Sequence, residues 1–547
     1  MSYAAEQDGI RRVSVVNANV DKATAQEAAQ AVEMEQNMGL LKSLKLYRRA
    51  CFWSIFLSTC IIMEGFDKTL INNLYAYPPF KNKFGERLPN GDYEVTAAWQ
   101  AGLSNGALCG EIIGLFATGI ITDRFGYRKT LVGALTGCVC FIFVIFFCQN
   151  LTQLLVGEIL IGLPWGVFQT TAPTYASEVC PVHLRAYLTT YVNLCWVLGQ
   201  FIASGVLRAM LARDDQWGYR IPFALQWIWP IPLAIGIWLA PESPWWLVRR
   251  GRLEDAKRSL ERLTTRNSPV EFKPDETISM MVHTNELEKE QTAGTSYMDL
   301  FKGVNLRRTE IVCVTWGIQA MCGSSFMGYS TYFYQNAGMA VTNSFNMSLA
   351  QYAIGAVGVL AAWTLMLRLG RRTLYLYGQL IMCVLLLTTG CASFAGKENE
   401  AAQWAIGSLL LIYTFTYDCT VGPVCYSLVS ELPTTRLRNK SVVMARNFYN
   451  ICGIVTNIIT PRMLNPGAWN WGAKSGFFFA GTCLLCAIWT FFRLPEPKDR
   501  SYSELDILFE QRISARKFSS TYVDRLDANI QDVQGKDDVK VEYSEKN

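Results

Sequence analysis

The chain has 547 residues, of which 51% are hydrophobic, 13% aromatic and only 17% charged. Long apolar stretches alternate with short charged loops, which is typical of a protein that crosses the membrane many times and excludes a soluble globular enzyme. The placement of the charges matters more than their net value of +5, and we expect no nucleic-acid partner.

The 17 cysteines and two histidines show no metal-binding pattern. Most cysteines lie inside apolar runs, where a free thiol behaves as a small hydrophobic side chain. No Cys-x-x-Cys spacing stands in a polar loop, and His183 and His283 lie in separate polar segments. We therefore expect neither a metal site, a disulfide framework nor a cofactor.

Residues 1–45 are polar and carry no signal-peptide pattern, so we expect this N-terminal tail to stay in the cytosol. Twelve apolar stretches of about twenty residues follow, which predicts an all-α polytopic membrane protein with twelve transmembrane helices. We place the spans near residues 50–76, 97–121, 130–149, 152–174, 186–209, 222–240, 310–336, 347–367, 373–395, 403–429, 440–463 and 473–493.

The longest polar interruption, Pro241 to Arg308, divides the spans into six and six. The expected organisation is a tail (1–45), a six-helix bundle (46–240), a cytosolic linker with surface helices (241–308), a second six-helix bundle (309–493) and a C-terminal cytosolic tail (494–547). Within the linker, residues 253–260 have the spacing of an amphipathic helix. Residues 1–45 and about 510–547 lack apolar periodicity, so we expect neither to fold alone.

Basic residues gather in the loops that follow the even-numbered spans. Because cytosolic loops carry an excess of Lys and Arg, this pattern places both termini in the cytosol. The residues concerned are Arg124, Arg128, Lys129, Arg185, Arg249, Arg250, Arg252, Lys257, Arg258, Arg368, Arg371, Arg372, Arg436, Arg438 and Lys440.

The first span holds two acids, Glu64 and Asp67, that project from one helix face because they are three residues apart. Ionisable groups at bilayer depth are costly and persist mainly where they face a bundle interior or a water-filled path. An alternative is a shorter helix that ends near Met63 and leaves both acids in solvent.

The segment Gly119-Ile-Ile-Thr-Asp-Arg-Phe-Gly-Tyr-Arg-Lys129 resembles the GxxxDRxGRR loop of the major facilitator superfamily. Pro241-Glu-Ser-Pro-Trp-Trp-Leu247 and Pro495-Glu-Pro-Lys498 resemble the PESPRWL and PETKG segments of its sugar porter branch, and ExxPxxxR-like segments begin at Glu178 and Glu431. The resemblance implies two six-helix bundles related by a pseudo-two-fold axis. It implies conformational gating by Gly119, Asp123, Arg124, Gly126, Arg128, Glu178, Arg185, Glu242, Arg368, Arg372, Glu431 and Arg436.

Two departures from the sugar porter pattern concern charge. The family's FGYD reads Glu64-Gly-Phe-Asp67 here, and Gly157 is followed by Glu158 where the family has arginine. We therefore expect Glu64, Asp67 and Glu158 to form an acid cluster that couples transport to protons, with Lys68 as the only evident cation. These segments, with Gly162-Leu-Pro-Trp-Gly-Val-Phe-Gln169, resemble the fungal α-glucoside permeases, which are maltose-type proton symporters.

The family's sugar-binding positions fall on polar and aromatic residues of this chain. Amide and hydroxyl groups offer donors and acceptors to a polyol, and aromatic faces cover its C–H patches. Several are smaller than the family's residues, which leaves room for a disaccharide; the alternative is that they only bond neighbouring helices. They are Asn193, Gln319, Ser325, Tyr329, Tyr426 and Asn447.

Together these features predict a proton-coupled symporter that imports maltose-like α-glucosides across the plasma membrane by alternating access. We expect its partners to be a sugar and the lipid bilayer. We expect the proton to be its coupling ion and a monomer to be its transport unit. The alternatives are a hexose transporter of the same fold and a transporter-like sugar sensor. An enzyme is the least favoured reading, because no nucleophile–base pair or metal spacing is apparent.

Overall fold

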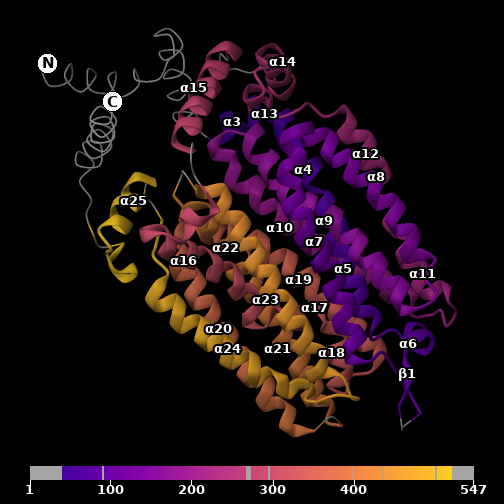
Figure 1. Cartoon of the computed structure of the whole chain (residues 1–547). Coiled ribbons are helices and arrows are strands. Elements are labelled where there is room, and N and C mark those ends of the chain that lie inside the picture. The colour runs from indigo at the N-terminus through magenta and orange to yellow at the C-terminus, as the bar shows by residue number, and fades with distance from the viewer. Residues whose placement is uncertain are drawn as a thin grey trace, which may run out of the picture.

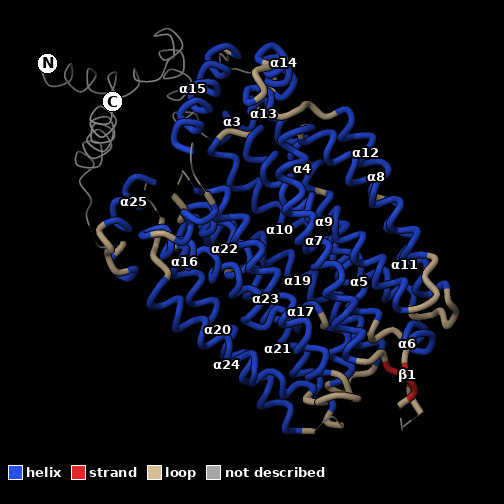
Figure 2. Tube along the Cα trace, viewed as in Figure 1, coloured by secondary structure: helices blue, strands red, loops and turns tan. Residues whose placement is uncertain are grey.

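The computed structural model describes residues 40–88, 91–265, 273–292, 296–396, 398–434, 437–498, 500, 502–519 and 521. Within them, twelve helices are long and apolar enough to cross a membrane. Figures 1 and 2 show these helices as one elongated bundle with a single short hairpin. The predicted fold class, an all-α membrane protein with twelve spans, is confirmed.

The first half of the bundle precedes the linker. It ends in a tilted sixth span made of two helices joined by a 3-10 turn. The elements are α3 (Leu40–Leu46), α4 (Arg48–Ser58), α5 (Cys60–Leu74), α6 (Pro78–Phe84), β1 (Glu86–Arg87), β2 (Tyr93–Glu94), α7 (Ala97–Phe125), α8 (Tyr127–Phe146), α9 (Leu151–Val179), α10 (Val182–Met210), α11 (Trp217–Leu225), η1 (Gln226–Ile228) and α12 (Pro230–Leu239).

The linker contributes α13 (Pro244–Arg249), α14 (Leu253–Leu263), α15 (Pro274–Thr292) and η2 (Tyr297–Phe301). The predicted amphipathic helix is confirmed, because α14 buries Ala256, Leu260 and Leu263. In Figure 1 the helices α13, α14 and α15 lie at one end of the bundle, called here the linker end. The opposite end carries α6, β1 and β2 and is called the hairpin end.

The second half repeats the pattern of six spans and closes with a short C-terminal helix. Its elements are α16 (Gly303–Gln319), η3 (Ala320–Ser324), α17 (Ser325–Gly328), α18 (Ser330–Asn336), α19 (Val341–Arg368), α20 (Arg371–Ala392), η4 (Ser393–Ala395), α21 (Glu400–Cys419), α22 (Val421–Glu431), α23 (Arg438–Leu464), η6 (Gly472–Lys474), α24 (Ser475–Arg493), α25 (Tyr502–Glu510) and η7 (Ala515–Lys517).

The first span runs through both acids. Helix α4 ends at Ser58, and after a turn at Thr59 the span continues as α5. In α5, Glu64 and Asp67 are each 0% exposed. The alternative helix that ends near Met63 is therefore wrong.

The seventh span, expected as one helix over 310–336, is broken. A π-helical turn, η3, contains Gly323 at φ 101°, a left-handed conformation that favours glycine. The hydroxyl of Tyr413 donates to the Cys322 carbonyl over 2.8 Å and so satisfies a backbone group released by the break. The break changes the direction of the chain for the residues that follow it, which include Ser325 and Tyr329.

Parts of the two terminal segments, which were not expected to fold alone, pack against the bundle. Leu46 at the end of α3 is 0% exposed, and after α25 the chain turns back so that Ala515 and Phe518 are buried. Arg308 forms a 2.5 Å ion pair with Asp506 and anchors this C-terminal segment to α16. Residues 40–45 and 511–518 are thus ordered by docking on the bundle, and the expectation for the rest of both tails concerns residues 1–39 and 522–547, which lie outside the described residues.

Helices α7 and α9 approach through glycines on both sides. Gly110 and Gly114 lie four residues apart on α7, and Gly162 and Gly166 do so on α9. A Cβ on Gly110 would lie 2.1 Å from the Ile159 carbonyl oxygen. A backbone carbonyl cannot swing aside, so only residues without a Cβ allow this approach.

We expect Gly110→Ala to lower the unfolding free energy by about 1–3 kcal/mol, because the added methyl group overpacks a backbone contact. Gly133 on α8 is the matched control, since nothing lies within 4 Å of its added Cβ. Gly133→Ala should be neutral or should stabilise by at most about 1 kcal/mol through helix propensity. Thermal unfolding of both variants in detergent is the measurement, and equal shifts of Tm would contradict the packing argument.

Candidate functional site

A network of four charged side chains lies at the centre of the bundle. Lys68 Nζ on α5 lies 2.8 Å from Glu64 Oε1 and 2.6 Å from Glu111 Oε2 on α7. Arg446 Nη2 on α23 lies 2.9 Å from Glu111 Oε1. The network has two acids and two bases and is formally neutral, as burial of charge requires. Because α23 belongs to the second half, the Glu111–Arg446 pair joins the two halves.

Aromatic and amide groups complete the surroundings of this central network. Gln169 Nε2 on α9 donates to Glu64 Oε2 over 2.8 Å. The Lys68 ammonium lies 4.9 Å from the ring centre of Trp196, and the Arg446 guanidinium lies 4.8 Å from that of Tyr449. Cations in such places are attracted by the ring quadrupole.

The sequence reasoning missed Glu111 and Arg446. The signal was present, because each is a lone charged residue in the interior of a predicted apolar span. Of the three acids of the expected cluster, Glu64 pairs with Lys68, whereas Arg446 joins the network through Glu111, which lies outside that cluster.

Asp67 and Glu158 form a second site towards the hairpin end. Asp67 accepts hydrogen bonds from Gln226 Nε2 (2.8 Å) and Trp165 Nε1 (3.4 Å). Glu158 is 1% exposed, and its Oε1 has no hydrogen-bond partner among the described residues. The two carboxyl groups lie within electrostatic range of each other. The single acid cluster expected from the sequence is thus divided into two neighbouring sites, with Glu64 in the central network.

Two of the predicted sugar positions lie where α22 begins. Gln319 Nε2 donates to the Gly422 carbonyl over 3.0 Å. Tyr426 on α22 packs edge-on against Trp316, with ring centres 5.6 Å apart. Trp316 and Gln319 share one face of α16, so this face carries both an amide and an aromatic ring.

Other predicted sugar positions hold polar atoms that the described residues leave unpaired. Asn193 Nδ2 on α10 and Asn447 Oδ1 on α23 have no hydrogen-bond partner among these residues. Asn450, which the sequence reasoning did not single out, is 0% exposed and has neither amide atom bonded. Trp316 Nε1 is unpaired as well. Buried polar groups usually have partners, so this set is available to a polar ligand. Ser325 is half-buried at the start of α17, and no hydrogen bond of its side chain is described.

The last predicted sugar position, Tyr329, contacts the first half towards the hairpin end. Its ring stacks on Tyr75 of the first half with centres 6.0 Å apart, and its hydroxyl lies 2.7 Å from Ser104 Oγ. Two further second-half side chains donate to first-half carbonyls nearby: Gln335 Nε2 to Ala76 (2.9 Å) and Asn465 Nδ2 to Val95 (2.8 Å). The halves are therefore held together at this end.

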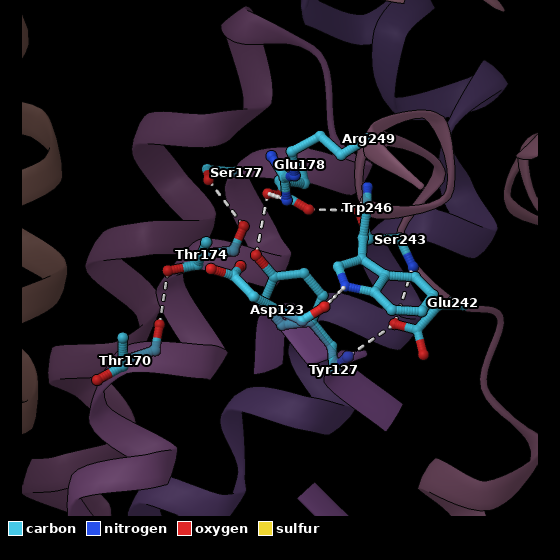
Figure 3. A network of polar contacts seen from close by, with 10 residues as sticks. All are labelled: Asp123, Tyr127, Thr170, Thr174, Ser177, Glu178, Glu242, Ser243, Trp246 and Arg249. Atoms are coloured by element: carbon cyan, nitrogen blue, oxygen red, sulfur yellow. Dashed lines mark hydrogen bonds and ion pairs between the residues drawn. The ribbon is translucent and has the colours of Figure 1, made fainter. Parts of the chain in front are cut away.

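At the linker end, three of the residues expected to take part in gating, Asp123, Glu178 and Glu242, belong to the network in Figure 3. The carboxylate of Glu242 accepts from the backbone N–H groups of Tyr127 (2.9 Å) and Arg128 (3.2 Å). Gly126 has φ +89°, and an added Cβ would lie 2.7 Å from Glu242 Oε2. Burial raises the pKa of Glu242, while backbone N–H groups favour its charged form.

Glu178 is the second acid of Figure 3. It accepts from Tyr127 Oη (2.9 Å), Arg249 Nη2 (2.6 Å) and the Ser243 hydroxyl. Asp123 takes part through its backbone carbonyl, which accepts from Trp246 Nε1 over 3.1 Å, while its side chain is exposed. Arg124 is exposed too, and Gly119 lies on α7 with open space around it. Sequence reasoning missed Tyr127, Ser243 and Arg249 as members of this network.

The second half has an equivalent network. Glu496 accepts from the backbone N–H groups of Arg371 (2.8 Å) and Arg372 (3.1 Å), as Glu242 does from Tyr127 and Arg128. Glu431 accepts from Ser427 Oγ over 2.6 Å and lies 3.4 Å from Arg371 Nη2. The side chain of Arg368 is exposed, and its carbonyl accepts from Lys498. The side chain of Arg185 and the whole of Arg436 lie outside the described residues.

Two six-span halves, a charged centre and paired networks at one end define a transporter with the fold of the major facilitator superfamily. Among solved structures, the proton:xylose symporter XylE bound to 6-bromo-6-deoxy-D-glucose has a TM-score of 0.67 at 20% identity, covering 85% of this chain and 99% of that one. The inward-open xylose transporter XylE from E. coli has a TM-score of 0.66 at 19% identity, covering 84% and 99%. Such similarity shows the fold.

Residues 53–509 match the family described as "Sugar (and other) transporter", and the chain belongs to this family. It is 43% identical over 507 residues to a maltose permease of Saccharomyces cerevisiae, covering 91% of this chain and 82% of the relative. It is 42% identical over 523 residues to the general alpha-glucoside permease of Saccharomyces cerevisiae, covering 95% and 84%. The resemblance to α-glucoside permeases is confirmed, and the chain is a membrane carrier of a transporter family, not an enzyme.

The Glu111–Arg446 pair allows a test of the central network. Glu111→Gln leaves Arg446 buried without a carboxylate, which should lower stability by about 3–5 kcal/mol. Arg446→Gln should cost less, because Glu111 keeps its ion pair with Lys68 at 2.6 Å. The double variant removes both charges and should regain most of this loss. Thermal unfolding in detergent measures the cycle, and strictly additive losses would show that the two charges do not stabilise each other.

Proposed function

We propose that the protein is a proton-coupled symporter that imports α-glucosides such as maltose across the plasma membrane by alternating access. The observation that carries this proposal is the Asp67–Glu158 pair, two buried carboxyl groups whose described hydrogen-bond partners are uncharged. The substrate follows from the named activity of the relatives, a maltose permease and a general alpha-glucoside permease. The sugar is the ligand, the proton the coupling ion, and no cofactor is required.

The linker end faces the cytosol in this proposal, together with both termini. Its support is the concentration of Lys and Arg in the loops of that end. The contacts between the halves at the hairpin end then close the path to the outside, as in an inward-facing state. The transport unit is a monomer, since each half supplies one side of the central path.

Proton coupling in this scheme uses Glu64, Asp67 and Glu158. Two carboxylates close together at bilayer depth repel each other, and one bound proton removes that repulsion. Loss of the proton restores it and disfavours the state in which both groups are enclosed. Glu64 lies one helical turn before Lys68, which contacts Glu111, so a change at the acids can reach the pair that joins the halves.

Sugar recognition rests on Asn193, Gln319, Ser325, Tyr329, Tyr426 and Asn447. A polyol needs both donors and acceptors, and the unpaired amide atoms of Asn193 and Asn447 supply one of each. Tyr426 and Trp316, in contact with each other on the second half, offer aromatic faces to the sugar. One network in each half, around Glu178 and Glu242 or around Glu431 and Glu496, holds that half rigid while the halves rock. The other residues proposed to take part in conformational gating are Gly119, Asp123, Arg124, Gly126, Arg128, Arg185, Arg368, Arg372 and Arg436.

We expect the double variant Asp67→Asn with Glu158→Gln to lose uphill sugar accumulation and to keep sugar exchange. The amides preserve size and hydrogen bonding but cannot bind and release a proton. Uptake of radiolabelled maltose into proteoliposomes, with and without an imposed pH gradient, is the measurement.

Glu86→Gln is the matched control for the same chemical change, because Glu86 is exposed in the hairpin. It should accumulate maltose like the natural protein. Gradient-driven accumulation that survives in the double variant would assign the coupling to other groups.

Larger side chains at two of the proposed sugar positions should shift the substrate preference from maltose towards glucose. Ser325→Asn with Tyr426→Trp adds volume, and Tyr426 already contacts Trp316, so the larger ring must occupy space on the path side. Maltose transport should fall at least about tenfold more than glucose transport, as expected when a second ring no longer fits.

Competition of both sugars in the same vesicles is the measurement, with Tyr377→Trp as control because Tyr377 is 61% exposed on α20. Equal losses for the two sugars, or natural glucose transport above maltose transport, would favour a hexose transporter. Sugar binding without flux would favour a sensor.

A further inference from the structure

A cavity of about 350 Å³ lies at the linker end, apart from the central path. It is formed where α16, α24 and the C-terminal segment meet. Its lining contains three arginines, two phenylalanines, a serine and no acidic residue. The lining residues are Gly303, Val304, Arg307, Phe492, Arg493, Phe509, Arg512, Ser514 and Ala515.

Two of the three arginines are available to an anion. Arg493 is paired with Glu310 through its Nε over 3.1 Å and through Nη2. In the described part of the chain, Arg307 and Arg512 form no ion pair with a carboxylate. The guanidinium of Arg307 is instead positioned by aromatic rings, 5.3 Å from the centre of Phe509 and 5.9 Å from that of Phe518. Stacking of this kind leaves the N–H groups at the edge free to donate.

Three acidic residues lie near the cavity, and one of them, Glu510, is exposed beside the lining residue Phe509. Asp506 is paired with Arg308 at 2.5 Å, and Glu310 with Arg493. Arg516, another exposed arginine of the same segment, lies 4.8 Å from the ring centre of Phe491. The surroundings of the cavity therefore carry an excess of positive charge, which favours a phosphate-bearing ligand.

An apolar stripe on the exposed surface of α24 begins at the cavity. Phe492, one of its lining residues, is 57% exposed, and Ile488 and Leu485 are 47% and 67% exposed. These three residues share one face of the helix because they are spaced by four and three residues. The stripe leads away from the arginines along the span, as an acyl chain would.

We propose that this cavity binds the headgroup of an anionic, phosphate-bearing phospholipid, with its acyl chains along the Leu485–Phe492 stripe. Basic pockets at the cytosolic ends of transmembrane helices suit such headgroups, and the apolar stripe distinguishes a lipid from a soluble phosphate. The lipid joins the C-terminal segment, through Arg512, to α16, through Arg307. One part of this proposal, the leaflet that supplies the lipid, rests on the proposed orientation, in which the linker end faces the cytosol.

The test measures binding of fluorescent dioctanoyl phosphatidylinositol 4-phosphate to the full-length protein in neutral detergent. Arg307→Gln with Arg512→Gln should weaken binding at least about tenfold, through loss of charge-assisted hydrogen bonds. Arg512→Gln alone should weaken it by a smaller factor, and it leaves the stacking of Arg307 intact. The control, Arg252→Gln with Arg258→Gln, removes two exposed linker-end arginines on or beside α14 and should leave affinity unchanged.

Three competitors distinguish the possible ligands. Dioctanoyl phosphatidylinositol should displace the probe, whereas inositol 1,4-bisphosphate and dioctanoyl phosphatidylcholine should do so poorly. Equal competition by inositol 1,4-bisphosphate would overturn the lipid in favour of a soluble anion. Residues 522–547 contain seven acidic residues and lie outside the described part of the chain. If the probe bound only to a chain that ends at Thr521, the acidic tail would be the occupant of the cavity, and the proposal would be overturned. Equal affinity of all arginine variants for the probe would also overturn it.

Discussion

Charge buried at bilayer depth must be paired, and the rest of the structure depends on how this is done. Lys68 lies between two carboxylates, and one of these, Glu111, also holds Arg446. Removal of any member leaves an uncompensated ion where solvation is poor, which costs several kcal/mol. The network ties α5 and α7 of the first half to α23 of the second. A motion that separates the halves must therefore break or carry the Glu111–Arg446 pair.

The neighbouring Asp67–Glu158 site is built on the opposite principle. The hydrogen bonds described for Asp67 come from an amide and an indole, and one oxygen of Glu158 has no partner among the described residues. A group held by strong ion pairs keeps a fixed charge, while a carboxyl group without a direct ion pair can gain or lose a proton at lower cost. In the proposed mechanism the central network links the two halves, and the Asp67–Glu158 site binds and releases the coupling proton.

The linker end shows the same construction in each half. A carboxylate that follows the last span of the half, Glu242 or Glu496, accepts hydrogen bonds from the backbone N–H groups at the start of a neighbouring helix. A second carboxylate, Glu178 or Glu431, binds a hydroxyl and an arginine beside it. Such repetition is expected of a carrier made of two related halves. Each network fixes helix ends within its own half, so that a half can move as a body.

The sequence determined the features that depend on neighbours along the chain. Apolar runs of about twenty residues give the twelve spans, and short motifs give the family and the acids at the linker end, because length and local composition decide these. Tertiary structure alone decided that Glu111 meets Arg446, 335 residues later, and that Glu158 lies with Asp67 and apart from Glu64. It also decided the break at Gly323 and the docking of Asp506 on Arg308. The physical reason is that helix rotation and tilt are set by packing between distant segments, such as the glycine contacts of α7 and α9, and no local pattern encodes them.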